Sequence, residues 1–175
     1  MRTLITFLMV FITMSLNPNT TLSLIEETKI EKKEEIVNEL DKFLHALGHQ
    51  ESGNRYDVVN RFGYMGKYQF GKSTLRTLKI KVDKKTFLNN PELQEYAMME
   101  LLCYNKNKLQ KYINEFEGKE VNGILVTESG LLAAAHLGGQ GSVKKWFRNG
   151  KVMKDGNGVK ITSYMQRFGG YKLYL

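Results

Sequence analysis

Residues 43–75 constrain this chain more than any other part of its sequence. They begin with apolar residues at helical spacing, and Glu51-Ser52-Gly53 ends that helical pattern, since glycine tolerates the left-handed conformation that follows a helix. A loop follows that must turn tightly at Gly63 and Gly66 before a second helical pattern begins. The stretch therefore predicts a carboxylate at the end of a helix, facing a glycine-rich loop.

Glu51 is the candidate catalytic residue of this stretch. It would lie at the negative end of the helix dipole, which favours the neutral form of a carboxylic acid, and burial would favour that form further. A general acid needs its proton near neutral pH, so the position suits a group that protonates a leaving oxygen. A solvated, idle glutamate at a helix end is the alternative, and the motifs that follow in the chain favour the catalytic interpretation.

The loop after this glutamate carries the aromatic and amide side chains that a sugar-binding site needs. Tyr64 and Tyr68 are candidates for stacking on sugar rings, and packing of the loop onto the domain is their alternative role. Gln69 would donate its amide to a sugar hydroxyl or an N-acetyl oxygen, or else tie down its own loop. An acid beside such groups predicts a site that cleaves a glycosidic bond.

These motifs resemble the catalytic core of the lysozyme-like lytic transglycosylases. In that family the catalytic glutamate lies in a Glu-Ser-Gly turn at a helix end, which corresponds to Glu51. A Gly-x-x-Gly-x-x-Gln loop follows in the family, and Gly63, Gly66 and Gln69 match it. The resemblance covers roughly residues 36–171.

A later part of the chain also corresponds to the family, with departures. The family's Ala-Tyr-Asn-Ala-Gly segment falls on residues 134–138, where Ala135 replaces the tyrosine and His136 replaces the asparagine. The resemblance makes His136 a substrate-binding candidate. Tyr164 lies where the family has a tyrosine close to the glutamate, and a role as a core aromatic is its alternative.

The resemblance implies cleavage of peptidoglycan between N-acetylmuramic acid and N-acetylglucosamine by a single acid, with no cofactor and no metal. Glu51 would protonate the glycosidic oxygen and then accept the proton of the muramic acid 6-hydroxyl, which closes onto C1 to give a 1,6-anhydro end. A hydrolytic muramidase on the same fold is one alternative, with Asp57 as second carboxylate. The others are a non-catalytic envelope protein that binds peptidoglycan, and a zinc hydrolase using His45, His49 and His136.

The N-terminus and the charge indicate an exported protein with an anionic partner. Arg2 precedes a short apolar run over residues 4–16, and we interpret residues 1–23 as a signal peptide, with an uncleaved anchor as the alternative. The run is too short for an ordinary membrane span, so we expect the periplasm or cell envelope, with no stable span after signal removal. The net charge of +8 suits nucleic acid, anionic lipid or an anionic cell-wall polymer, and no arginine-rich run or motif indicates nucleic acid.

Almost every periodic segment of the chain is helical, which predicts an all-α, lysozyme-like single domain over residues 36–175. A charged, frayed lead-in is expected before it, over residues 24–35. A short extended piece or loop is expected around Asn122-Gly123, and a tight turn at residues 155–158. The expected helices cover residues 31–50, 73–80, 91–116, 128–137, 142–147 and 162–168.

Overall fold

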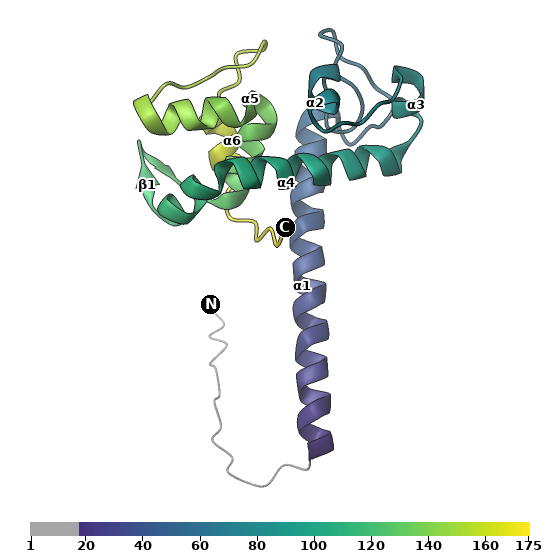
Figure 1. Ribbon diagram of the computed structural model, residues 1–175, viewed down its shortest axis with the longest axis vertical. Helices are drawn as coiled ribbons and strands as arrows, with labels where there is room; N and C mark the ends of the chain where they lie inside the picture. The colour runs from purple at the N-terminus through teal and green to yellow at the C-terminus, as the bar shows by residue number, and fades with distance from the viewer. Residues whose placement is uncertain (1–17) are drawn as a thin grey trace, which may run out of the picture. The chain divides into compact units, whose positions relative to one another are not determined.

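The computed structural model describes the backbone of residues 18–175, together with the side chains of residues 26–33 and 39–175. The described chain is mostly helical, so the predicted all-α class is confirmed at this level (Figure 1). Residues 36–175 form one compact unit, and residues 1–35 are divided from it. The elements are α1 (Pro18–Ser52), α2 (Lys72–Thr77), α3 (Lys84–Leu88), α4 (Pro91–Phe116), β1 (Glu120–Val121), β2 (Ile124–Leu125), α5 (Glu128–Asn149) and α6 (Ile161–Arg167).

Helix α1 is longer than its apolar pattern predicts. It ends at Ser52, and Gly53 follows with a φ of 68°, which is the left-handed stop expected from the sequence. The helix already includes residues 24–35, so the prediction of a frayed lead-in is wrong. Glutamate and lysine favour the helical state, and they supply most of that segment. Of the predicted signal peptide, residues 1–17 lie outside the described residues.

Capping side chains start three of the helices after α1, namely α3, α4 and α5. Asn90 accepts a hydrogen bond from the backbone of Leu93, and Pro91 occupies the first position of α4, as predicted. Helix α3 was not predicted, because five residues are too few for a periodic pattern. Its start is fixed by Asp83, which accepts hydrogen bonds from both the backbone and the hydroxyl of Thr86.

A small hairpin and a kinked helix complete the chain before α6. Strands β1 and β2 pair antiparallel across Asn122 and Gly123, whose φ values of 50° and 76° are those of a tight hairpin turn. Helix α5 was predicted as two helices separated by glycines. It is one element with a kink at Gly139, where φ is 74° and ψ is 152°. The axis of α5 therefore changes direction at Gly139.

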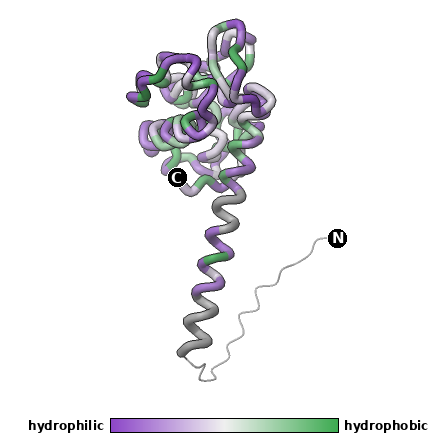
Figure 2. The backbone as a smooth tube through the Cα atoms, turned by 90° about the vertical axis from the view of Figure 1, so that its right-hand side faces the viewer, coloured by the Kyte–Doolittle hydropathy of each residue, from purple (hydrophilic) through white to green (hydrophobic). Residues whose placement is uncertain are grey.

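The core of residues 36–175 forms where amphipathic helices meet. Helix α4 packs against α5, and α5 packs against α6. Hydrophobic and hydrophilic segments alternate along this part of the chain, as amphipathic helices require (Figure 2). Among the described residues no helix combines the length and the apolar character that a membrane crossing requires. The largest fully buried side chains are Trp146, Tyr68, Phe43, Phe70, Phe87 and Phe168.

Candidate active site

Ser52 fixes the end of α1, and with it the position of Glu51. The hydroxyl of Ser52 donates to the carbonyl oxygen of Lys67 at 2.8 Å and accepts from the backbone of Arg55 at 3.0 Å. The last turn of the helix is thereby tied to the glycine-rich loop. Glu51 itself has a side chain that is 13% exposed, so it lies in a largely enclosed position.

Two side chains from distant parts of the sequence contact the Glu51 carboxylate. The hydroxyl of Tyr164, on α6, donates to Oε1 at 2.6 Å. Burial raises the pKa of the Tyr164 phenol, and the nearby charge of Glu51 raises it further, so this hydroxyl keeps its proton. His136, on α5, places Nε2 3.8 Å from the same oxygen.

His136 is an uncharged neighbour of this carboxylate. Its side chain is 7% exposed, and burial lowers its pKa below the usual 6.5 despite the opposing effects of Glu51 and of a backbone hydrogen bond at Tyr68. The imidazole is therefore neutral at pH 7 and does not neutralise Glu51. Its Nδ1 atom is buried and has no hydrogen-bond partner among the described residues.

The carboxylate of Glu51 faces a cleft of about 500 Å³. Such a volume lies within the range of small-ligand sites. One wall comes from α1 and the loop that follows it, and the other from α5, α6 and the turn between them. The lining includes Glu51, Asn60, Phe62, Tyr64, Gln69, His136, Leu137, Lys154, Asp155, Asn157 and Tyr164.

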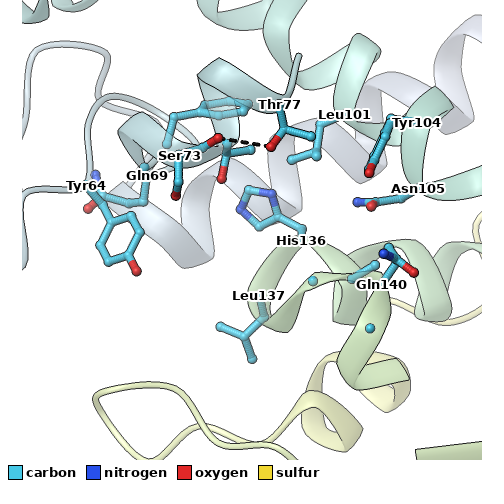
Figure 3. A pocket seen from close by; sticks show the side chains of 16 residues that line it. Tyr64, Gln69, Ser73, Thr77, Leu101, Tyr104, Asn105, His136, Leu137 and Gln140 are labelled. Atoms are coloured by element: carbon cyan, nitrogen blue, oxygen red, sulfur yellow. Dashed lines mark hydrogen bonds between the residues drawn. The ribbon is translucent and has the colours of Figure 1, made fainter. Parts of the chain in front are cut away.

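A second pocket of about 330 Å³ adjoins this cleft. The two share four lining residues, Tyr64, Gln69, His136 and Leu137, so they form one continuous groove. Figure 3 shows the second pocket between α2, α4 and α5, with the ring of His136 at its centre. His136 therefore stands where the two parts of the groove meet.

Tyr64 and Gln69, which were predicted to bind substrate, both line the groove. Tyr64 is exposed, so its ring is open to a ligand. Gln69 has a positive φ of 52°, and its amide nitrogen donates to the carbonyl oxygen of Gly66 at 2.8 Å. Gln69 therefore ties down its own loop, as the alternative interpretation expected, while it also lies on the groove.

The prediction that Tyr68 binds substrate is wrong. Its side chain is 0% exposed, and its hydroxyl donates to Oε2 of Glu95 at 2.6 Å, away from the groove. Lys67 and Tyr56 both contact the other carboxylate oxygen, with Lys67 Nζ at 2.7 Å and Tyr56 Oη at 2.6 Å. Tyr68 thus belongs to a cluster, Tyr56–Lys67–Tyr68–Glu95, that fastens the loop to α4.

The turn at residues 154–159 was recognised as a turn from its sequence but not as part of a site. Asp155 Oδ1 accepts hydrogen bonds from the backbones of Asn157 and Val159, which shapes the turn. Arg61 donates to the Asn157 side chain at 2.7 Å, so the turn touches the glycine-rich loop. The sequence feature that could have indicated this contact was the pair of glycines in the turn. Gly156, one of the pair, lies close to the ring of Phe62 in that loop.

The alternative acids and ligands lie elsewhere or have other partners. Asp57 is exposed and lines a separate pocket, so it does not share the cleft with Glu51. Asp155 is the second carboxylate of that cleft. His45 and His49 are exposed beside a different pocket from His136. Over the part of the chain that the structure describes, no group of His, Cys, Asp and Glu side chains could hold a metal ion.

The structure brings five of the six predicted site residues to one groove and leaves Tyr68 out of it. Those five come from α1, its following loop, α5 and α6, which no local sequence motif joins. The resemblance to lytic transglycosylases stays a prediction. No protein-family model, curated protein or solved structure matches this chain.

Proposed function

We propose that this chain is a peptidoglycan-cleaving lytic transglycosylase with a lysozyme-like fold, and that Glu51 is its catalytic acid. One observation carries the proposal. The Glu51 side chain is 13% exposed, opens onto a cleft of about 500 Å³, and accepts a 2.6 Å hydrogen bond from Tyr164. An enclosed carboxylate with a fixed orientation and access to a ligand cleft is what general acid catalysis requires.

The first step is transfer of the Glu51 proton to the glycosidic oxygen. In its protonated form Glu51 gives this proton to the oxygen between muramic acid C1 and N-acetylglucosamine, and the C1–O bond breaks. Positive charge develops on the muramic acid ring as the bond breaks, and the resulting carboxylate stabilises it. Tyr164 supports this step, since its hydrogen bond stabilises the negative charge left on Glu51.

In the second step the same carboxylate acts as the base. It accepts the proton of the muramic acid 6-hydroxyl, and O6 bonds to C1, which yields the 1,6-anhydro sugar and restores protonated Glu51. No water is consumed and no second carboxylate is needed. Neutral His136 beside Glu51 adds no positive charge, so it does not oppose the return of the proton.

The groove and the charge of the chain fit a glycan strand as substrate. Two adjoining pockets give room for neighbouring sugar units, and the exposed ring of Tyr64 lies where the pockets meet. The net charge of +8 favours approach to an anionic wall polymer. An export signal in residues 1–23 would bring the protein to the periplasm or cell envelope, where that polymer lies.

Digestion of purified sacculi by the wild type and by Glu51→Gln tests this function. We expect the wild type to release fragments that mass spectrometry identifies as 1,6-anhydro muropeptides, while Glu51→Gln releases none. The variant should keep the circular dichroism spectrum of the wild type, because glutamine is nearly isosteric. Release of anhydro fragments by Glu51→Gln at the wild-type rate would refute the assignment.

A hydrolytic muramidase is the second candidate, and Asp155 favours it. Asp155 lines the same cleft as Glu51 and could activate a water on the other side of a sugar. Its Oδ1 already accepts two backbone hydrogen bonds, which favours a structural role. Fragments with reducing ends instead of anhydro ends, and their loss in Asp155→Asn, would establish the hydrolase. A protein that binds sacculi and leaves them intact would be the non-catalytic alternative.

A further inference from the structure

The second pocket of the groove, between α2, α4 and α5, contains an unusual concentration of unsatisfied polar atoms. Asn105, His136 and Gln140 line it, and each has one buried atom with no hydrogen-bond partner among the described residues, namely Asn105 Nδ2, His136 Nδ1 and Gln140 Oε1. Buried polar atoms without partners are rare in folded proteins because each one loses its water without a replacement. Three in one pocket indicate that a ligand supplies the missing partners.

Asn105 is the most informative of the three. It lies in the middle of the unbroken helix α4 and is 2% exposed, on a buried face where its neighbours Leu101, Leu102 and Leu109 are apolar. Figure 3 shows its amide directed toward the ring of His136, in the interior of the pocket. Its nitrogen has no partner among the described residues, and a buried amide nitrogen without a partner costs free energy that an apolar side chain would not.

A second buried amide on the same helix shows what a structural role looks like. Gln94 is fully buried, and its oxygen accepts from the backbone of Lys67 at 2.8 Å. Its nitrogen donates to the carbonyl oxygens of Tyr56 and Phe87 at 3.0 and 2.8 Å. Gln94 is thus satisfied within the protein, whereas the nitrogen of Asn105 is left for a partner from outside.

The chemistry of the pocket defines the ligand. Asn105 offers a donor and Gln140 an acceptor, which together match the carbonyl oxygen and the N–H of a secondary amide. None of the lining residues is Asp, Glu, Lys or Arg, and burial keeps His136 neutral, so the ligand is uncharged. The adjoining cleft differs, because Glu51, Lys154 and Asp155 give it charge.

We propose that this pocket binds the acetamido group of an N-acetylglucosamine unit, with Asn105 donating to the carbonyl oxygen and Gln140 accepting from the N–H. The inference rests on the proposed function and adds to it which sugar of the glycan strand occupies which part of the groove. The uncharged sugar occupies this pocket, and the muramic acid, with its charged substituents, occupies the cleft beside Glu51.

Binding of two uncharged tetrasaccharides tests the pocket. Tetra-N-acetylchitotetraose carries acetamido groups and cellotetraose lacks them. Their affinities are measured by isothermal titration calorimetry on Glu51→Gln protein, so that no cleavage occurs. We expect chitotetraose to bind and cellotetraose to bind at least about tenfold more weakly, the loss expected when buried amide partners stay unpaired. Equal affinity for the two sugars would overturn the proposal.

Substitutions in the same protein connect this preference to the pocket. Asn105→Leu should weaken chitotetraose binding about tenfold, and its melting temperature without ligand should not fall, because an unsatisfied buried amide is removed. Asn107→Leu is the matched control, since Asn107 is an exposed residue of the same helix, and its affinity should be unchanged. Gln140→Met supplies a second test on α5, with the same expected loss.

The outcomes separate the pocket from the catalytic function. If the wild type cleaves sacculi but both Asn105→Leu and Gln140→Met bind chitotetraose normally, the pocket assignment is wrong and the enzyme assignment stands. If sacculi stay intact while chitotetraose binding depends on Asn105, the enzyme assignment fails and the pocket stands. Should Asn105→Leu not fold, Gln140→Met alone decides.

Discussion

Two glutamates of this protein accept a 2.6 Å hydrogen bond from a tyrosine, and their surroundings are otherwise opposite. Glu51 is bonded by Tyr164, and Glu95 by both Tyr56 and Tyr68. Glu95 also has the ammonium of Lys67 at 2.7 Å, whereas among the described residues the basic side chain within 4 Å of Glu51 is the neutral His136, at 3.8 Å. Glu95 thus has a cationic partner, and Glu51 has none within 4 Å in the part of the chain that the structure describes.

The difference separates a structural carboxylate from a candidate catalytic one. Burial raises the pKa of Glu95, but the hydrogen bonds from Lys67, Tyr56 and Tyr68 outweigh it and leave the pKa below the usual value, so Glu95 stays ionised. A carboxylate held in this way cannot donate a proton near neutral pH. A tyrosine partner alone therefore does not mark a catalytic acid. Glu51 is proposed as the catalytic acid because its tyrosine partner is combined with an open cleft.

The same substitution at the two glutamates should give the largest contrast. Glu51→Gln is expected to lower sacculus cleavage by at least about a thousandfold, which corresponds to about 4 kcal/mol of activation free energy. Glu95→Gln should cleave at close to the wild-type rate per folded molecule, because it lies outside the groove. Turbidity clearance, normalised to folded protein, measures both. Equal losses in the two variants would remove the distinction.

Replacement of the tyrosine partners of the two glutamates should give the next-largest contrast in cleavage rate. Tyr164→Phe is expected to lower the rate constant of cleavage by about 10- to 100-fold, because the developing carboxylate loses a hydrogen bond. Tyr68→Phe should leave the rate unchanged and lower the free energy of unfolding by about 1 kcal/mol. Rates under saturating sacculi and urea denaturation curves provide the two readouts. A Tyr68→Phe variant that is stable but inactive would contradict this division.

Glu95→Gln should also sharpen the contrast through stability. We expect a loss of about 1–2 kcal/mol in the free energy of unfolding at pH 7, kept small because the Glu95 side chain is 34% exposed. The folded-state pKa is lowered from 4.5, so the wild-type contribution is complete above that pH and is lost as pH falls through the folded-state pKa. Urea curves at pH 3–7 should show a weaker acid dependence in the variant.

Replacement of His136 should give the smallest effect, a change in how the free energy of unfolding depends on pH. Because its folded-state pKa is lowered from 6.5, the unfolded chain binds the proton more readily. Its contribution to stability is complete above pH 6.5 and is lost as pH falls through the folded-state pKa. His136→Asn should flatten the stability profile just below pH 6.5. A profile identical to that of the wild type would mean that His136 is not buried as a neutral group.

The sequence predicted the local structure around the candidate site better than it predicted which distant residues contact it. Glu51 was found because a helix end, a glycine and a loop are consecutive in the chain. Tyr68 and Gln69 are adjacent in that loop, and nothing local shows which one turns inward. Tyr68 turns inward because its hydroxyl donates a hydrogen bond to Glu95, which lies on α4. The turn at residues 154–159 was likewise predicted in its shape, and only tertiary packing placed it on the cleft.

Lys67 touches both carboxylate regions, but with different atoms. Its carbonyl oxygen holds Ser52, next to Glu51, and its ammonium holds Glu95. Any residue can provide the first contact, and only a long cationic side chain the second. Replacement of Lys67 by methionine would thus remove the ion pair to Glu95, while the bonds of Tyr56 and Tyr68 to Glu95 and the bond of the Lys67 carbonyl oxygen to Ser52 remain. The contribution of this one ion pair can therefore be measured apart from the other attachments of the loop.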